Sequence, residues 1–98
     1  MLIHKERLTG STASGSLVLT TVKFSGVRLI HIYVKPATAS TTYDLLIEDI
    51  NGDDLFNELG IQGTLNRTIR IPTYGSHTVT ISNALLDEAF VVNLGLEE

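Results

Sequence analysis

The segment from Arg28 to Leu55 constrains the fold most strongly, because it holds two long runs of strand-forming residues. The first run, RLIHIYVKP, is rich in β-branched and aromatic residues. Pro36 has no backbone N–H, so it is expected to end this strand or lie at an edge. In the second run, YDLLIEDI, side chains alternate, and Tyr43, Leu45 and Ile47 share one face. Together the two runs predict β-sheet.

Strict alternation in the first run places Ile30, Ile32 and Val34 on one face of its strand. Leu29 and Tyr33 fall on the opposite face with His31, so both faces carry bulky side chains. His31 is interpreted as part of a half-buried sheet face.

A tight hairpin is predicted after the second run, where Asn51 is followed by Gly52. Both residue types tolerate positive φ, which a two-residue type I′ turn requires at both central positions. A short return strand over residues 53–56 is expected to follow, and residues 57–65 are interpreted as a loop with an edge segment because two glycines interrupt them.

The other expected strands show the same alternation between turn-forming residues. Val79 and Ile81 lie on one face of their strand, and the hydroxyl residues 78, 80 and 82 lie on the other. This alternation is typical of an antiparallel strand with one solvated face. The closing strand directs Phe90, Val92 and Leu94 to one side, together with Leu96. The expected ranges are 17–24, 27–35, 43–50, 53–56, 66–71, 77–83 and 89–96. Seven to eight short strands without a convincing helix predict an all-β fold, a single antiparallel, jelly-roll-like β-sandwich.

Length and composition restrict the class of protein. A chain of 98 residues is expected to form one domain, and 43% of it is hydrophobic, which is enough for a modest core. It contains no cysteine, so stability must come from packing or from neighbouring subunits. The net charge of −4 argues against nucleic acid as the main partner. No apolar run approaches the roughly 18 residues of a membrane span, so no membrane partner is expected.

The N-terminal residues 1–16 are interpreted as an arm followed by a flexible loop, and residues 17–98 as the sandwich domain. The loop GSTASGS consists of small and polar residues. Leu2, Ile3 and Leu8 are the candidate interface residues, which would pack on a neighbouring subunit. A short strand and a frayed terminus are the alternatives for the first nine residues.

Candidate metal ligands occur in two groups. The carboxylates of residues 48–54 surround the Asn-Gly turn, but the acidic closing ligand of a calcium loop is missing. Asp and Asn that cap their own backbone are the favoured explanation. His4, His31 and His77 are widely spaced, and a zinc site would require the fold to bring them together. No metal and no cofactor are therefore expected.

Catalytic motifs are absent from the sequence: no serine lies in a nucleophile-elbow pattern, and the glycines do not form a phosphate-binding loop. The chain is therefore expected not to be an enzyme. A carbohydrate-binding module remains an alternative, although the sequence has no tryptophan and few aromatic residues to form sugar platforms.

Residues 27–96 resemble a group of short β-rich virion structural proteins of tailed bacteriophages. The resemblance rests on a strand ending in Pro36, a Thr/Ala-rich loop and the pair Tyr43-Asp44 that opens the next strand. It also rests on the acidic turn 49–55, on Asn66-Arg67 and on the strand 79–83.

The resemblance implies a structural virion protein, in the first instance a capsid decoration or cement protein that stabilises the shell by protein–protein contacts. The implied partners are further copies of the chain, with a trimer as the first expectation, and the major capsid protein or other virion proteins. A tail, collar or baseplate component is the alternative within this class. The expected location is the virion.

Overall fold

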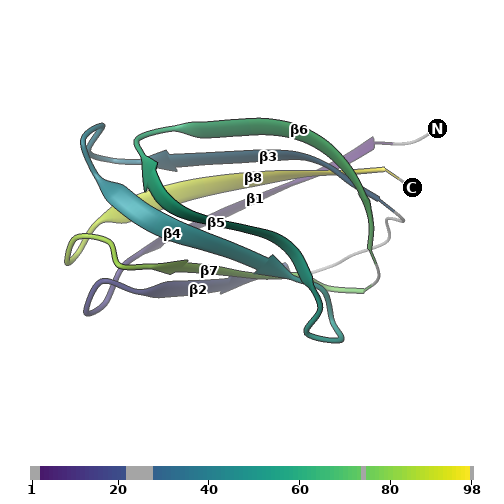
Figure 1. Ribbon diagram of the computed structural model, residues 1–98, viewed down its shortest axis with the longest axis horizontal. Helices are drawn as coiled ribbons and strands as arrows, with labels where there is room; N and C mark the ends of the chain where they lie inside the picture. Colours follow the sequence, from purple (N-terminus) through teal and green to yellow (C-terminus); the bar gives the residue numbers. More distant parts are fainter. Residues whose placement is uncertain (1–2, 22–27, 74, 98) are drawn as a thin grey trace.

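The chain forms two antiparallel sheets that pack face to face, as the ribbon of the computed structural model shows (Figure 1). The structure describes residues 3–21, 28–73 and 75–97. Its strands are β1 (Ile3–Ser11), β2 (Leu17–Thr20), β3 (Arg28–Pro36), β4 (Thr42–Glu48), β5 (Asp54–Gln62), β6 (Leu65–Pro72), β7 (Thr78–Ser82) and β8 (Ala89–Glu97). The predicted all-β sandwich is therefore confirmed.

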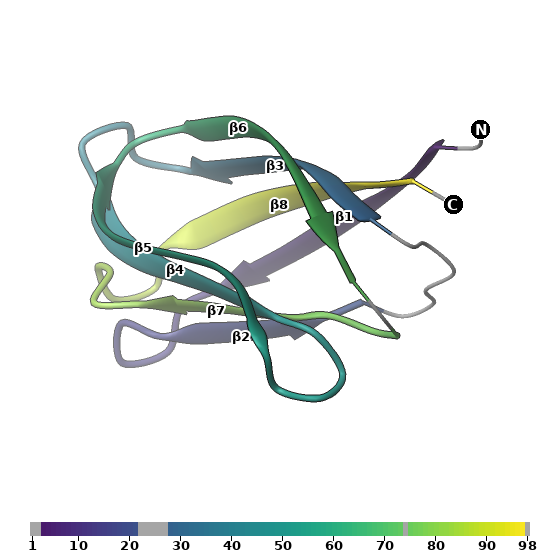
Figure 2. The same cartoon turned by 45° about the vertical axis from the view of Figure 1, so that its right-hand side comes forward.

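Strand order identifies the sandwich as a jelly roll. One sheet has the order β1-β8-β3-β6, and the other has the order β2-β7-β4-β5. Strand β1 pairs with β8, β2 with β7, β3 with β6 and β4 with β5, always antiparallel. The chain thus runs like one long hairpin that has been rolled up. Its connections cross from one sheet to the other, except at the β4–β5 hairpin, which stays within one sheet (Figure 2).

The core lies between the sheets and is built from the predicted alternating faces. Tyr43, Leu45 and Ile47 of β4 are buried, and so are the four apolar residues 90, 92, 94 and 96 of β8. The rings of Tyr43 and Phe90 meet edge to face across the two sheets, with centroids 5.1 Å apart. The apolar alternation of these strands is therefore explained by one buried face each.

In β3 the predicted faces are wrong at the start of the strand. A bulge between Leu29 and His31 places one additional residue opposite β8. Leu29 is therefore buried together with Ile32 and Val34, whereas Ile30 is only partly buried. The extra residue of the bulge shifts the alternation by one position, which strict period-two reasoning does not allow.

The turn after β4 is a hairpin, but its predicted type is wrong. Gly52 has a φ of 80°, whereas Asn51 is not among the residues with positive φ. The N–H of Gly52 donates to the carbonyl of Asp49 (3.1 Å), and the N–H of Asp49 donates to the carbonyl of Asp53 (3.1 Å). This is the pattern of a three-residue loop that ends in a left-handed glycine. The Asp49 side chain also accepts from the backbone N–H groups of Asn51 and Asp53, which confirms that it caps its own turn.

Strand β5 is longer than predicted, because it continues from Asp54 to Gln62 where a loop was expected. Gly60 does not end the strand. Its φ is 66°, and the register with β4 shifts around it. Its N–H donates to Asp44 on β4 (2.9 Å), so the glycine is accommodated in a bulge.

The N-terminal segment is a strand, which was the alternative, and not the expected tethered arm. All nine residues of β1 pair with β8, and Leu8 is buried in the core. The expected flexible loop is a tight turn in which Ala13 and Ser16 exchange two backbone hydrogen bonds. The sandwich therefore includes β1, because pairing with β8 and burial of Leu8 stabilise the segment within its own chain. Leu2 lies outside the described residues, as does the side chain of Ile3.

Candidate binding surfaces

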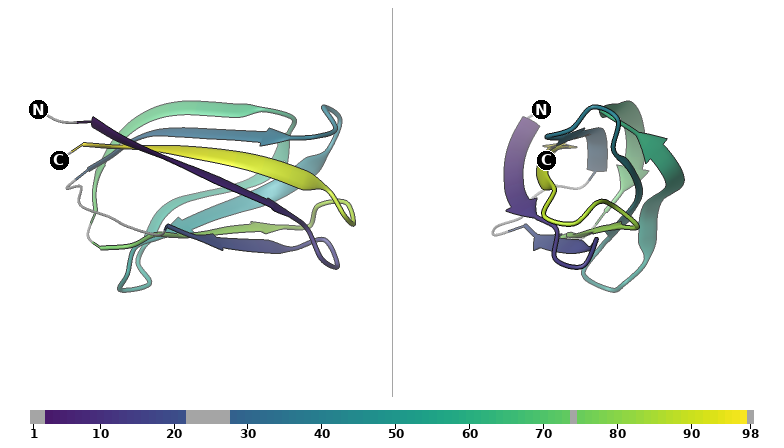
Figure 3. Two further views of the ribbon diagram at one scale, coloured as in Figure 1. Left: turned by 180° about the vertical axis from the view of Figure 1, so that it is seen from behind. Right: turned by 90° about the vertical axis from the view of Figure 1, so that its left-hand side faces the viewer.

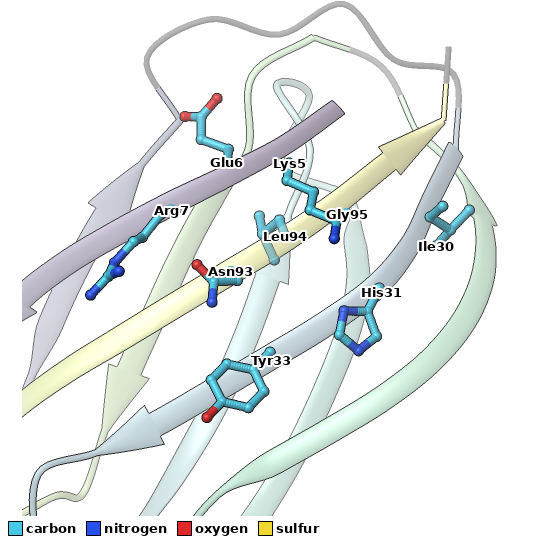
Figure 4. A pocket seen from close by; sticks show the side chains of 9 residues that line it. All are labelled: Lys5, Glu6, Arg7, Ile30, His31, Tyr33, Asn93, Leu94 and Gly95. Atoms are coloured by element: carbon cyan, nitrogen blue, oxygen red, sulfur yellow. The ribbon is translucent and has the colours of Figure 1, made fainter. Parts of the chain in front are cut away.

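A hollow of about 530 Å³ lies on the outer face of the sheet formed by β1, β8 and β3. Gly95 lies in its floor, and we call the hollow the Gly95 groove (Figure 4). Any larger residue would crowd the floor of the groove, since a Cβ at position 95 would lie only 3.0 Å from the Cβ of His31. The lining residues are Lys5, Glu6, Arg7, Ile30, His31, Tyr33, Asn93, Leu94 and Gly95.

The registers of the sheet arrange the polar groups of the groove in rows across the strands. In one row Arg7 is opposite Asn93, which is opposite Tyr33. In the neighbouring row Lys5 is opposite Gly95, which is opposite His31. Figure 4 shows Arg7, Asn93 and Tyr33 on the same side of the sheet, and Lys5 reaching from β1 towards Gly95. Three segments that are far apart in the sequence thus form one surface.

Two rows continue onto β6, where Asn66 pairs with Tyr33 and Thr68 with His31. The imidazole Nε2 of His31 lies 2.6 Å from the side-chain oxygen of Asn66. This contact fixes the His31 ring at the border of the groove.

Glu97 and Arg70 line an adjoining hollow over β6, which shares Ile30 and His31 with the Gly95 groove. There the carboxylate of Glu97 lies 2.6 Å from the guanidinium of Arg28 and 3.9 Å from that of Arg70. Within the part of the chain that the structure describes, no carboxylate forms a salt bridge with Lys5 or Arg7. The charged residues that line the Gly95 groove are the cations Lys5 and Arg7 and the carboxylate Glu6, so the groove has a local excess of positive charge on a chain whose net charge is −4.

A second candidate surface is the loop between β7 and β8, at the end of the sandwich that also carries the β1–β2 and β3–β4 loops (Figure 1). Leu85 and Leu86 are 54% and 69% exposed there. The loop backbone is fixed nonetheless. The Thr12 hydroxyl donates to the carbonyl of Leu85 (2.6 Å) and accepts from the N–H of Glu88 (2.9 Å). We call this surface the Leu85–Leu86 tip.

Glu88 connects the Leu85–Leu86 tip to the loop between β3 and β4. Its buried carboxylate accepts from the backbone N–H of Thr38 (2.7 Å) and from the hydroxyls of Thr38 and Thr41 (3.2 and 3.0 Å). The backbone N–H of Thr38 is the main reason that the pKa of Glu88 is lowered, because hydrogen bonds favour the charged carboxylate. The loop therefore presents two leucines to solvent on a rigid support.

The predicted metal ligands do not form a group. The three histidines have separate partners: His4 lies 3.6 Å from Glu6, His31 contacts Asn66, and His77 contacts Thr73. Burial lowers the pKa of His77, which is fully enclosed in the core. Among the described residues, no three His, Cys, Asp or Glu side chains are arranged to hold a metal ion.

Of the three predicted interface residues, only Leu8 can be placed by its side chain, and it packs into its own core. Sequence reasoning missed the groove residues Arg7 and Asn93. A local signal exists for Asn93, which lies between the buried Val92 and Leu94 and must therefore face outward. Its neighbours across the sheet could not be identified without the strand register.

Comparison with known proteins shows the fold. No protein-family model matches the chain, and no curated protein sequence matches it. The chain is similar to a solved structure described as "Bacillus endospore appendages form a novel family of disulfide-linked pili", with a TM-score of 0.62 and 15% identity over 98% of this chain and 87% of that one. It is also similar to the Yersinia pseudotuberculosis-derived mitogen, with a TM-score of 0.55 and 12% identity over 99% of this chain and 88% of the other.

At these identities the likenesses show only that the β-sandwich fold is shared. In the described part of the chain no helix is long and apolar enough to cross a membrane.

Proposed function

We propose that this chain is a structural subunit that acts through protein–protein contacts and without catalysis, as a virion structural protein of a tailed bacteriophage. More specifically, we propose a capsid decoration protein that forms a homo-oligomer, with a trimer as the first expectation. This oligomer would bind the major capsid protein. The observation that carries the proposal is the Leu85–Leu86 tip. Because their backbone is already fixed, two exposed leucines lose little conformational entropy when a partner docks on them. The partner also removes their apolar surface from water, which favours binding.

Support also comes from the fold. A similar fold occurs in a structure of Bacillus endospore appendages, which are described as disulfide-linked pili. This chain has no cysteine, so its assembly would depend on non-covalent contacts. Jelly rolls are also a common architecture of viral capsid domains.

The partner contacts are proposed at the tip and along the edge strand β1. Strand β1 lies at the edge of its sheet, beside β8 (Figure 3), so one side of its backbone is available for pairing with another chain. Leu8 contributes by holding β1 in place and not by contacting a partner, since its side chain is buried.

Sedimentation analysis of the purified chain tests the association. The double variant Leu85→Ser/Leu86→Ser is expected to lower the oligomeric state, whereas the matched variant Leu59→Ser, at a leucine that is 73% exposed on β5, is expected to leave it unchanged. A wild-type chain that remains monomeric at all concentrations would contradict the homo-oligomer. Mass spectrometry of purified phage particles tests the location, because a virion protein must be present in them at a fixed copy number.

A further inference from the structure

We propose that the Gly95 groove binds an acidic polysaccharide, whose carboxylates are held by Arg7 and Lys5. The groove shares strand β1 with the proposed partner contacts, but the Leu85–Leu86 tip, on which the test of assembly rests, lies on a loop outside the groove. Failure of one proposal can therefore be distinguished from failure of the other.

The charges of the groove select the sign of the ligand. Arg7 is exposed, and its planar guanidinium can hold a carboxylate through two parallel hydrogen bonds. Lys5 adds a second cation one row away, and Lys35, opposite Val91 of β8, adds a third on the same face of the sheet. The carboxylate of Glu97 on this face is already paired with Arg28. An anionic ligand is therefore attracted to this face of a chain that is acidic as a whole.

The uncharged groups of the groove select the chemistry of the ligand. Asn93 carries an amide that both donates and accepts hydrogen bonds, and Tyr33 combines an apolar ring with a hydroxyl. Both are partly exposed and lie next to each other in the same row as Arg7. Such a set matches a ligand with many hydroxyl groups and regularly placed carboxylates, which is the composition of a uronic-acid polymer.

The position of the groove argues against an acidic peptide. Strands β8 and β3 each pair with neighbours on both sides, so their backbone hydrogen-bonding groups are used within the sheet. A peptide that binds by strand addition could pair only with the free edge of β1, and over β8 and β3 it would find only side chains. A sugar chain needs no backbone partner, because its hydroxyls bond to side chains.

The dimensions allow a chain of sugars to cross the sheet. The row from Arg7 through Asn93 and Tyr33 to Asn66 spans four strands. At a strand spacing of 4.7–4.9 Å the row is roughly 14 Å long. The groove volume of 530 Å³ lies within the usual range of ligand sites.

Binding is tested by calorimetric titration of the full chain with oligogalacturonate. The methyl-esterified oligomer has the same sugar rings without the charge, and a poly-glutamate peptide has the charge without the rings. We expect the oligogalacturonate to bind and the other two to bind at least about tenfold more weakly, because each lacks half of the recognised groups. Amide resonances of Asn93, Gly95 and His31 should shift when the oligogalacturonate is added.

Two variants locate the site. Arg7→Gln should weaken oligogalacturonate binding about tenfold, since it removes a charge-assisted pair. The matched variant Arg67→Gln removes the same charge on the opposite side of β6, where Arg67 pairs with Glu58 at 3.1 Å, and should leave the affinity unchanged. Equal weakening by both variants would overturn the groove as the site. Tighter binding of poly-glutamate would overturn the saccharide, and failure of oligogalacturonate to bind would overturn the proposal as a whole.

Discussion

The carboxylate of Glu88 accepts a hydrogen bond of 2.7 Å from the backbone N–H of Thr38, a residue 50 positions away in the sequence. This contact joins the loop before β8, which carries Leu85 and Leu86, to the loop after β3. The apolar tip is rigid because a buried anion supports it.

Loss of this anion is expected to loosen the tip. Glu88→Ala removes the acceptor of three hydrogen bonds donated by Thr38 and Thr41. These donors would lose their partner in the folded protein, which lowers its stability. We expect a melting temperature that is several degrees lower and faster amide hydrogen exchange in residues 84–88. Glu88→Gln keeps one acceptor oxygen and should lie between the wild type and Glu88→Ala. Unchanged exchange in the alanine variant would show that the loop is held by other contacts.

A valine at position 52 is expected to destabilise the β4–β5 hairpin. Gly52 has a φ of 80°, where β-branched residues are strained, and a Cβ there would meet no atom within 4 Å. The cost of Gly52→Val is therefore purely conformational, about 1–3 kcal/mol of unfolding free energy.

Chemical denaturation measures this cost, and Gly52→Asn is the control. Asparagine tolerates the left-handed conformation, so this variant should lose clearly less stability than Gly52→Val. Equal losses in the two variants would mean that the backbone conformation at position 52 is not the cause.

Acid is expected to weaken the fold through His77. Burial lowers the pKa of this imidazole in the folded state below its ordinary value of 6.5, while the negative charges of Asp49 and Glu6 partly oppose the shift. The unfolded chain therefore binds a proton more readily than the folded one, so stability is fully present above pH 6.5 and falls as the pH decreases below it. The carboxyls of Asp44 and Glu88 titrate in a lower range, because their pKa values lie below 3.8 and 4.5.

Thermal melts between pH 7.5 and 5 test this dependence. The wild type should lose stability steadily over that range, and His77→Gln should be less stable throughout but much flatter. A wild-type melting temperature that stays constant down to pH 5 would contradict a neutral buried imidazole.

The sequence was sufficient for those strands that bury one clean face. In β4 and β8 every second residue is apolar, and the structure buries these residues. It was insufficient in β3, because Leu29 and Ile30 are both large and apolar and either could face the core. Only the bulge, which depends on pairing with β8, decides between them.

The surfaces were less accessible to sequence reasoning than the core. The Gly95 groove combines Arg7, Tyr33 and Asn93, whose proximity follows from two strand registers that are set by the whole fold. In β1, the polar run from His4 to Arg7 concealed a strand that buries Leu8. An edge strand can be held by backbone pairing and few apolar contacts, so its composition resembles that of an arm.

Removal of residues 1–9 is expected to unfold the sandwich or lower its melting temperature strongly. The deletion removes most of β1, with the buried Leu8, and exposes the edge of β8, the strand that carries four core residues. A tethered arm, by contrast, could be removed from a domain that stays folded. Circular dichroism during heating distinguishes the two results.

Point variants separate the strand from its side chain. Leu8→Ala should lower the free energy of unfolding by about 2–5 kcal/mol, as expected for a buried leucine. Leu59→Ala, at a leucine that is 73% exposed, is the matched control and should change it by less than about 0.5 kcal/mol. If the truncated chain melts like the wild type and Leu8→Ala behaves like Leu59→Ala, β1 does not contribute to the fold and the segment acts as an arm. A large loss in both the truncated chain and Leu8→Ala is expected, because β1 closes the sheet beside β8 and Leu8 completes the core beneath it.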